Sequence, residues 1–408
     1  MKIRNLNIKR GRRGFTLVEI MVVMTIIAIL ISILVPAVGY VRETANESKC
    51  RANLRSFFLG MTGYADKNVG NKLSSGAWDG LRDGCMDTVG WVADMVNQKV
   101  CKPQELLCPT NVHRGTEKYN DYMGTATAGA KEGGPSNLVT GVGYCKTTAP
   151  GSWTGTMVAD NLLAKGYGTN YMTTWFHSRS APRVSASTSG VVTYNASTNG
   201  KLKGLAGSLG PLTRSMQDNS PVTSNTLPLM GDSNIGDIAD RTAEQGIVST
   251  AGVEFIPQGA TLAESFSDGP AARGDVSSWQ TTAPVTSIYN PTSAIDSIAE
   301  SEQPPAGSGV APAVNNAATD LQDYRDFAPA HRGSCNVLFA DGSVKSFIDS
   351  NGDTFLNPGF DGGSASAKGY TDNLVELPAA EIFSGILLQK FGSLHGTAST
   401  TADFFVVL

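Results

Sequence analysis

The stretch Gly14-Phe15-Thr16-Leu17-Val18-Glu19 decides the organisation of this chain, because it separates a basic leader from a long apolar segment. The leader, residues 1–14, holds six basic residues and no acidic one. The apolar segment runs from Ile20 to Val35, and Glu19 is the one formal charge between Phe15 and Tyr40. An ionisable side chain in such a segment is costly to bury, which makes Glu19 a candidate functional residue.

The segment from Phe15 to Val35 is long enough to span a bilayer, which takes about 20 residues. Basic residues remain on the cytoplasmic side, so everything after the segment is expected outside the cytoplasm. An ordinary signal anchor is the alternative, but it leaves Glu19 without a role. A secretory signal would have a shorter apolar core followed by a cleavage site of small residues.

The leader, the Gly-Phe step, the glutamate and the apolar length together closely resemble a type IV prepilin. In that family a prepilin peptidase at the inner membrane cuts after the glycine, and the new amino terminus is methylated. The resemblance assigns cleavage and N-terminal methylation to Gly14 and Phe15. Pro36 lies where prepilins commonly carry a proline in the helix.

Glu19 and Pro36 are accordingly predicted to act in assembly. When helices of neighbouring subunits pack together, the Glu19 carboxylate can face the Phe15 amine of the next subunit. Each charge then offsets the burial cost of the other, and the pair fixes the axial register.

Beyond Pro36 the pattern becomes amphipathic, with apolar residues mostly three or four positions apart. These are Val41, Ala45, Cys50, Leu54, Phe57, Met61 and Tyr64. One continuous helix is predicted from Phe15 to about Ala65, roughly 75 Å long. The predicted organisation is a leader at 1–14, an anchoring and filament-core helix at 15–66, and an exported domain at 67–408. The fold class is α+β with a largely antiparallel sheet, a C-terminal hairpin and long loops.

Composition limits the function classes. Removing the six basic leader residues from the 32 in the chain leaves 26 against 36 acidic residues, a net charge of −10. An acidic mature chain argues against nucleic acid as a partner. We find no catalytic triad, paired carboxylates or phosphate-binding loop, so no catalytic residue is assigned and an enzyme is not expected.

Six cysteines could pair in fifteen ways outside the cytoplasm, so the connectivity stays open. At least two of Cys85, Cys101, Cys108 and Cys145 are expected to form disulfides. Cys101, Cys108 and His113 could also be considered as zinc ligands, but their spacing is not C-x-x-C and an exported domain favours disulfides.

A β-hairpin is predicted near the end of the chain, where two β-rich runs flank Asp341-Gly342. If Ala340 lies opposite Ser343, one buried face carries apolar residues from both strands: Cys335, Val337, Phe339, Val344 and Ile348. His331 then lies far from Asp341 along the strand, so the two are not expected to form a catalytic pair.

His331 and Asp341-Gly342 match the H-x9-D-G signature, which resembles that of a planctomycete-type group of prepilin-like proteins. Shorter matches extend this resemblance at 50–54, 106–109, 167–171 and 262–270. Asp349, Asn351 and Asp353 follow the hairpin with the alternating oxygens that suit Ca²⁺, although the match to a calcium loop is partial. A solvated turn is the alternative here, as it is for a loop bracketed by Asp232 and Asp237.

The sequence therefore predicts a structural subunit of a type IV pilus-like or type II secretion pseudopilus-like filament. It would be a single-pass inner-membrane protein that enters a periplasmic or cell-surface filament. The resemblance implies as partners a prepilin peptidase, other pilin-like subunits, an assembly ATPase and its platform. No cofactor is required, with Ca²⁺ as an option. One alternative is a membrane-tethered module, binding for example polysaccharide, that uses a prepilin leader for export. The other is a surface hydrolase on the same anchor, which would need a pocket with converging titratable residues.

Overall fold

The computed structural model describes residues 15–125, 134–182, 184–186, 192–194, 203–236, 242–267, 269–272, 320–360 and 370–385. Gly14 with the rest of the leader, and Asp237, lie outside these residues. The chain divides into two units, Met1–Asn46 and Glu47–Leu408. Helix α1, Leu17–Lys67, contributes residues to both units. Each unit is described by itself below.

Short helices and strands make up the second unit beyond α1. Its α-helices are α2 (Trp91–Asn97), α3 (Lys118–Met123), α4 (Ser136–Val139), α5 (Gly155–Asn161), α6 (Trp175–Arg179) and α7 (Arg214–Asp218). Its 3-10 helices are η1 (Pro103–Leu106), η2 (Gly143–Lys146), η3 (Leu163–Lys165) and η4 (Leu205–Gly207). Its strands are β1 (Tyr171–Thr173), β2 (Val184–Ala186), β3 (Val192–Tyr194), β4 (Pro228–Asp232), β5 (Ile247–Val248), β6 (Glu254–Ile256), β7 (Gly269–Ala272), β8 (Asp320–Asp323), β9 (Ser334–Phe339) and β10 (Val344–Ile348).

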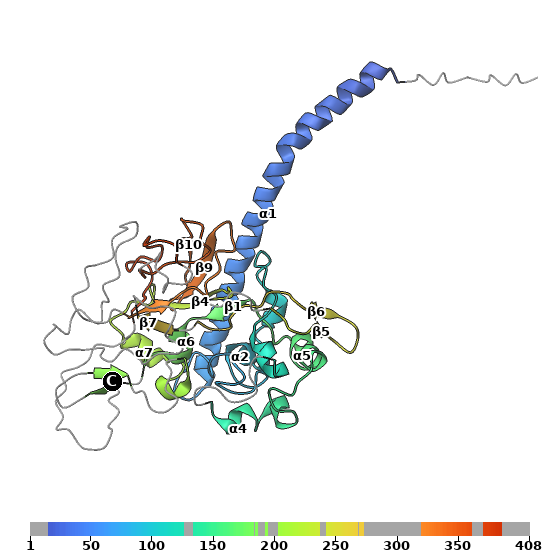
Figure 1. The fold of residues 1–408 in the computed structure, drawn as a ribbon. Helices are drawn as coiled ribbons and strands as arrows, with labels where there is room; N and C mark the ends of the chain where they lie inside the picture. Colours follow the sequence, from blue (N-terminus) through green and yellow to red (C-terminus); the bar gives the residue numbers. More distant parts are fainter. Residues whose placement is uncertain are drawn as a thin grey trace, which may run out of the picture. The chain divides into compact units, whose positions relative to one another are not determined.

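The central sheet is antiparallel, with strand order β1-β4-β9-β10 (Figure 1). The described residues also form three two-stranded antiparallel pairs, β2-β3, β5-β6 and β7-β8. The predicted α+β class, a long N-terminal helix followed by a domain with antiparallel sheets, is confirmed.

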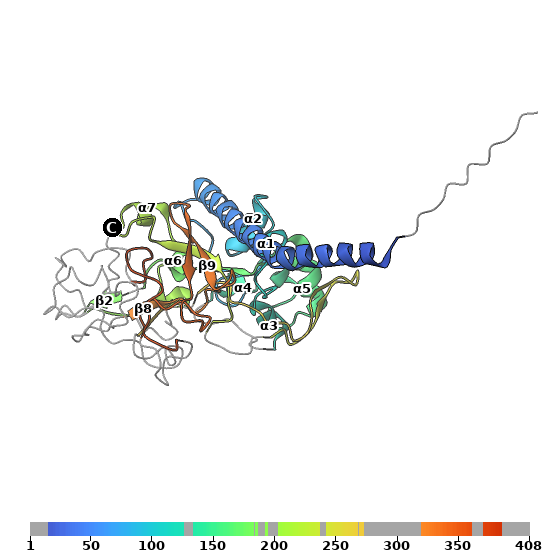
Figure 2. The same ribbon diagram turned by 90° about the horizontal axis from the view of Figure 1, so that it is seen from above.

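The second-unit part of α1 packs its apolar stripe into the core. Cys50, Leu54, Phe57, Met61 and Ala65 are fully buried, at steps of three or four residues. This spacing places them on one face of the helix, as the sequence pattern predicted for Cys50 to Met61. At the end of the stripe Ala65 is buried, whereas the predicted Tyr64 is only half-buried. The same part of α1 lies beside α2 in both views (Figure 1 and Figure 2), and a Cβ added to Gly60 would meet the Sδ atom of Met95 at 2.0 Å. Glycine thus permits this close approach.

Strand β9 is buried on both faces. Leu338 and Ala340 join the core that contains the α1 stripe. Cys335, Val337 and Phe339 join a second core with Tyr324, Phe327, Leu356, Leu377 and Ile382. Because successive side chains of a strand point to opposite sides, the two cores lie on opposite faces of the sheet.

The hairpin lies where the sequence predicted it, but its predicted register was wrong by one residue. Val344 pairs with Leu338 and Phe347 pairs with Cys335, so the loop has three residues instead of two. Gly342 has a positive φ of 83°, as three-residue loops favour. A shift of one residue turns every side chain of β10 to the other face, which is why Ile348 is 62% exposed rather than in the core.

Candidate functional site

The N-terminal end of α1 forms a capping box. Thr16 precedes the helix, and its backbone N–H and hydroxyl donate to Glu19 Oε2 at 2.8 and 3.1 Å. The Glu19 backbone N–H donates in return to the Thr16 hydroxyl at 3.2 Å. This reciprocal Thr-x-x-Glu arrangement satisfies backbone donors at the helix start. It brings the Glu19 carboxylate back to the residue next to Phe15, a local role that the sequence analysis missed.

The helix that follows is apolar enough to cross a membrane. It is the one such helix among the described residues, with a most apolar window of mean hydropathy 2.9. Within its own unit the side chains of this window are exposed. Pro36 lies inside the helix, which continues without interruption through it. Together with the basic leader, this segment indicates membrane anchoring.

A second candidate site is a buried cluster in the second unit, formed by Cys50, Cys108, Asp232 and His331. One donor atom from each side chain lies within 4.8 Å of the others. The Cys50 thiol contacts the two Asp232 carboxylate oxygens at 3.3 and 3.2 Å. His331 Nε2 lies 3.4 Å from Cys108 Sγ and 3.4 Å from Asp232 Oδ2. Three of the four residues are fully buried, and His331 is 3% exposed.

Two asparagines hold the backbone beside this cluster. Asn170 accepts from the Cys108 backbone N–H at 2.8 Å and donates to the Cys108 carbonyl at 3.1 Å. Asn53, one turn along α1 from Cys50, donates to the Leu106 carbonyl at 2.7 Å and to the Tyr171 hydroxyl at 3.2 Å. Segments 50–54, 106–109 and 167–171, noted separately in the sequence, therefore meet around one centre.

The charges in the cluster compensate one another. Burial lowers the pKa of His331, but hydrogen bonds to Asp232 and Cys108 outweigh it and raise that pKa to about 11. Burial raises the pKa of Cys50 far above its ordinary value. The hydrogen bond from Cys50 lowers the pKa of Cys108. The protonated imidazole of His331 thus lies beside the side chain of Asp232, which also contacts Cys50.

The zinc set considered from sequence, Cys101, Cys108 and His113, is not brought together. His113 Nδ1 instead lies 3.0 Å from the Thr261 hydroxyl. Cys101 is half-buried and belongs to no group of potential metal-ligating side chains among the described residues. Asp232 does not begin a solvated cation loop, because it is fully buried at the end of β4. Sequence reasoning missed this cluster because its members come from distant segments.

Asp341 and Gly342 have a separate role from His331. The exposed Asp341 carboxylate accepts from the Ser343 backbone N–H at 2.8 Å, which closes the hairpin loop. A Cβ added to Gly342 would meet Cε1 of Phe58 on α1 at 2.7 Å. The two halves of the H-x9-D-G signature thus lie in different places. His331 belongs to the buried cluster, and Asp341-Gly342 forms the turn that packs on α1.

The predicted calcium loop brings carboxylates together. Oxygens of Asp349 and Asp353 lie within 4.8 Å of one another and of Glu376, which sequence reasoning did not include. Asp349 accepts from the backbone N–H groups of Gly352 and Thr354 at 2.7 and 2.9 Å. The Asn351 side-chain amide donates to Asp353 at 3.1 Å. These bonds are those of a self-supporting turn, and calcium binding there stays a prediction.

One disulfide joins Cys85 to Cys145 in the described part of the chain, with the Cα atoms 5.8 Å apart. This confirms the expectation that at least two of the four middle cysteines pair. Cys50, Cys101, Cys108 and Cys335 are free thiols. Disulfides persist in oxidising compartments, so the bond agrees with export of this domain.

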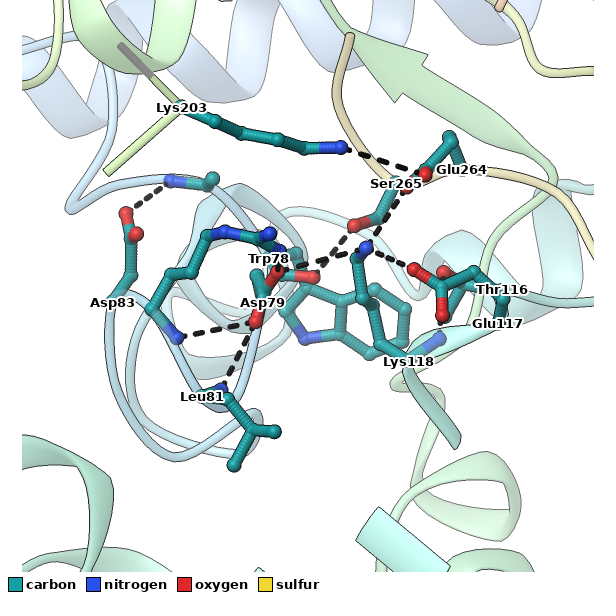
Figure 3. A network of polar contacts seen from close by, with 12 residues as sticks. Trp78, Asp79, Leu81, Asp83, Thr116, Glu117, Lys118, Lys203, Glu264 and Ser265 are labelled. Atoms are coloured by element: carbon teal, nitrogen blue, oxygen red, sulfur yellow. Dashed lines mark hydrogen bonds and ion pairs between the residues drawn. The ribbon is translucent and has the colours of Figure 1, made fainter. Parts of the chain in front are cut away.

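The second unit also holds a buried ion-pair network (Figure 3). The Lys118 ammonium lies 2.9 Å from Glu264 and 3.6 Å from Asp79, and it also pairs with Glu117. Lys203 reaches Glu264 at 3.5 Å. Burial lowers the pKa of Lys118, but these carboxylates outweigh it and raise that pKa above its ordinary value.

Further ion pairs complete the network. Arg82 pairs with Asp79 at 2.6 Å, and Arg179 pairs with Asp83 through two contacts of 2.5 and 2.8 Å. Arg179 and Lys203 also lie over the Phe266 ring, 5.0 and 5.2 Å from its centroid. These ion pairs connect residues 79–83 with Lys118, Arg179, Lys203 and Glu264.

Comparison with known protein families gives two matches. The prokaryotic N-terminal methylation motif matches residues 9–35, which contain Gly14, Phe15 and Glu19. A family described as "Protein of unknown function (DUF1559)" matches residues 40–354, well over half of the 408 residues. No curated protein and no solved structure matches the chain significantly. The chain therefore belongs to the DUF1559 family and is a prepilin-like protein, with the N-terminal methylation motif and the H-x9-D-G signature.

Proposed function

We propose that this protein is a structural subunit of a filament of the type IV pilus or type II secretion pseudopilus kind. The observation that carries the proposal is the methylation motif at residues 9–35, joined directly to a membrane-length helix with Glu19 in its first turn. Processing by a prepilin peptidase follows from the motif. In this proposal the processed helix anchors the chain first and later packs into a filament core.

Charge compensation gives the physical basis for assembly. Cleavage after Gly14 creates a cationic amine on Phe15, and an unpaired charge among packed apolar helices costs several kcal/mol. The capping box already holds the Glu19 carboxylate beside the N-terminal end of the helix. In a filament the same carboxylate would face the Phe15 amine of a neighbouring subunit. The pair then acts mainly to select one axial register.

The proposal also places the chain and its partners. The leader would stay cytoplasmic, one span would cross the inner membrane, and the second unit would lie in the periplasm or on the cell surface. The Cys85–Cys145 disulfide supports this placement. Other pilin-like subunits, an assembly ATPase and its platform are the proposed partners. The role is assembly, not catalysis.

The test combines the mature N-terminus with the assembly state. Mass spectrometry of the protein from its native cells should find an N-terminus at Phe15, with a methyl group. Crosslinking in intact cells should give oligomers of the chain, and shearing should release them when the filament is long. An intact Met1, or a chain that stays monomeric in the membrane, would contradict the proposal. The monomeric outcome with a processed N-terminus would favour a tethered binding module.

A further inference from the structure

The buried cluster of Cys50, Cys108, Asp232 and His331 combines two thiols, a carboxylate and an imidazole. Such a set is unusual for a purely structural core, because burying polar side chains costs free energy that other interactions must offset. Sulfur, nitrogen and carboxylate oxygen are the three ligand types that zinc takes in proteins. We propose that these four side chains form a structural zinc site, a role independent of filament assembly.

The distances in the cluster are close to those of a zinc centre. Bonds of about 2.3 Å to sulfur and about 2.0–2.2 Å to nitrogen or oxygen place the donor atoms of a tetrahedral zinc roughly 3.3–3.8 Å apart. The Cys50–Asp232 contacts are 3.3 and 3.2 Å, and the Cys108–His331 and His331–Asp232 contacts are both 3.4 Å. These three donor pairs would need to move by only a few tenths of an ångström to hold the ion, and all four donor atoms already lie within 4.8 Å of one another.

The site is closed and joins four parts of the second unit. Cys50 comes from α1, Cys108 from the loop after η1, Asp232 from the end of β4 and His331 from the segment before β9. Four protein ligands in a buried position leave no room for a reacting water, which is the arrangement of structural rather than catalytic zinc. Since these segments meet only in the folded chain, zinc binding would be coupled to folding.

The surroundings hold the ligands in place. Asn170 binds both the N–H and the carbonyl of Cys108, so the loop presents its sulfur inward. Asn53 ties α1 to the Leu106 carbonyl, which fixes Cys50 relative to that loop. Outer-shell hydrogen bonds of this kind orient metal ligands in known sites. Both asparagines are buried. In the proposed site their role is to hold the segments that carry the ligands.

The donor set distinguishes zinc from other occupants. Calcium and magnesium take oxygen ligands, whereas thiolates select softer ions. Binding would release the protons of both thiols and of the histidine, leaving two thiolates, a carboxylate and a neutral imidazole around Zn²⁺. The competing fate is oxidation of Cys50 and Cys108 to a disulfide, because both thiols lie in the same cluster.

The experiment uses the full-length chain, extracted in detergent with an affinity tag that contains no histidine. Elemental analysis should find one zinc ion per wild-type chain. Cys108→Ser and His331→Gln should lose it. Cys101→Ser and His113→Gln are matched controls, because they make the same kinds of substitution in the ligand set that the sequence suggested. Both variants should keep the zinc ion. Refolding wild-type protein with Co²⁺ should give the thiolate charge-transfer and visible absorption bands of tetrahedral cobalt. This measurement needs only the wild-type chain, so it does not depend on whether the variants fold.

Several outcomes would overturn the proposal. The proposal is wrong if wild-type protein contains no metal and also gives no cobalt absorption bands. A disulfide between Cys50 and Cys108 on peptide mapping would remove two ligands and reject the site. Another transition metal in native protein would reject zinc, and zinc that survives in Cys108→Ser and His331→Gln would place it elsewhere. Loss of zinc in the two control variants would favour the other ligand set.

Discussion

Asp94 illustrates how one buried side chain ties a loop to a helix. It lies in the first turn of α2, where its Oδ2 accepts from the backbone N–H of Ser75 at 2.7 Å and from the Ser75 hydroxyl at 3.1 Å. The Ser75 hydroxyl in turn accepts from the Gly90 N–H at 2.7 Å, just before the helix. Burial raises the pKa of Asp94 to about 7, although the bonds from Ser75 oppose the rise.

This raised pKa predicts a pH dependence of stability. A carboxyl that holds its proton more tightly in the folded state stabilises the fold at low pH, and that contribution fades as pH rises through about 7. Between pH 5 and pH 8 the loss for Asp94 should be about 2–3 kcal/mol. Asp94→Asn keeps an acceptor for Ser75 without the titration, so its denaturant unfolding should lack this component. Equal pH profiles for the two proteins would refute the assignment.

Gly342 is predicted to be required for two reasons, its φ of 83° and its approach to Phe58. Gly342→Ala should destabilise the protein by more than the about 1–2 kcal/mol that positive φ alone costs. Gly252→Ala is the matched control, because Gly252 has a φ of 80° but open space around its Cβ position. Thermal unfolding of both variants measures the difference. If Gly342→Ala costs no more than Gly252→Ala, the contact with Phe58 is unimportant.

The ion-pair network joins residues 79–83 to Lys118 of α3 and to Glu264. Removing one member of a buried pair leaves a charge uncompensated, which typically costs about 3–5 kcal/mol. Lys118→Ala should fall in that range, because three carboxylates surround the ammonium.

The control for this prediction is an exposed lysine in an ion pair. Lys102 pairs with Glu105 at 3.0 Å, and their side chains are 52% and 68% exposed. Lys102→Ala should change stability by less than about 1 kcal/mol. Denaturant unfolding measures the free energy of unfolding of both variants. Similar small losses of stability in the two would show that the network contributes little to stability.

The loop after β10 gives a prediction about calcium. If Asp349, Asn351 and Asp353 hold Ca²⁺ together with Glu376, binding to the folded state alone should raise the melting temperature. Removing calcium should lower that temperature, and adding back Ca²⁺ alone should restore it. Asp353→Ala should show neither change. A wild-type melting curve that is insensitive to calcium would leave a self-supporting turn.

The sequence predicted elements whose signal is local. The apolar stripe from Cys50 to Met61 repeats at helical spacing, and Asp341-Gly342 marks a turn, so both could be placed without a structure. The register of the hairpin could not, because a glycine with positive φ suits hairpin loops of two residues and of three. A turn motif predicts where a chain reverses but not which residues face one another.

The buried cluster shows a different limit. Cys50 and Asp232 are 182 residues apart, and Cys108 and His331 are 223 apart. No spacing rule connects such positions, so the sequence grouped Cys108 with its neighbours Cys101 and His113 instead. Cys50, Cys108, Asp232 and His331 come together only when α1 packs against the sheet and the loop after η1. Glu376 joined the Asp349 loop in the same way, through tertiary contacts alone.

In the proposed filament, the charge on Glu19 directs assembly through the N-terminal helix. The capping box offers a competing explanation, because Glu19 also completes hydrogen bonds at the start of its own helix. The two roles are separable. Glutamine can replace glutamate in a capping box but carries no charge. Thr16→Ala does the reverse, since it removes the cap, at a cost of about 1 kcal/mol, and keeps the charge.

The decisive measurement is the fraction of chain found in crosslinked and sheared assemblies, relative to membrane-bound chain, for wild type, Glu19→Gln and Thr16→Ala. Each variant is first shown by mass spectrometry to begin at a methylated Phe15. Charge pairing predicts that Thr16→Ala assembles nearly as wild type does, whereas Glu19→Gln accumulates in the membrane as processed, unassembled chain. Normal assembly of Glu19→Gln would show that the charge on Glu19 does not direct assembly.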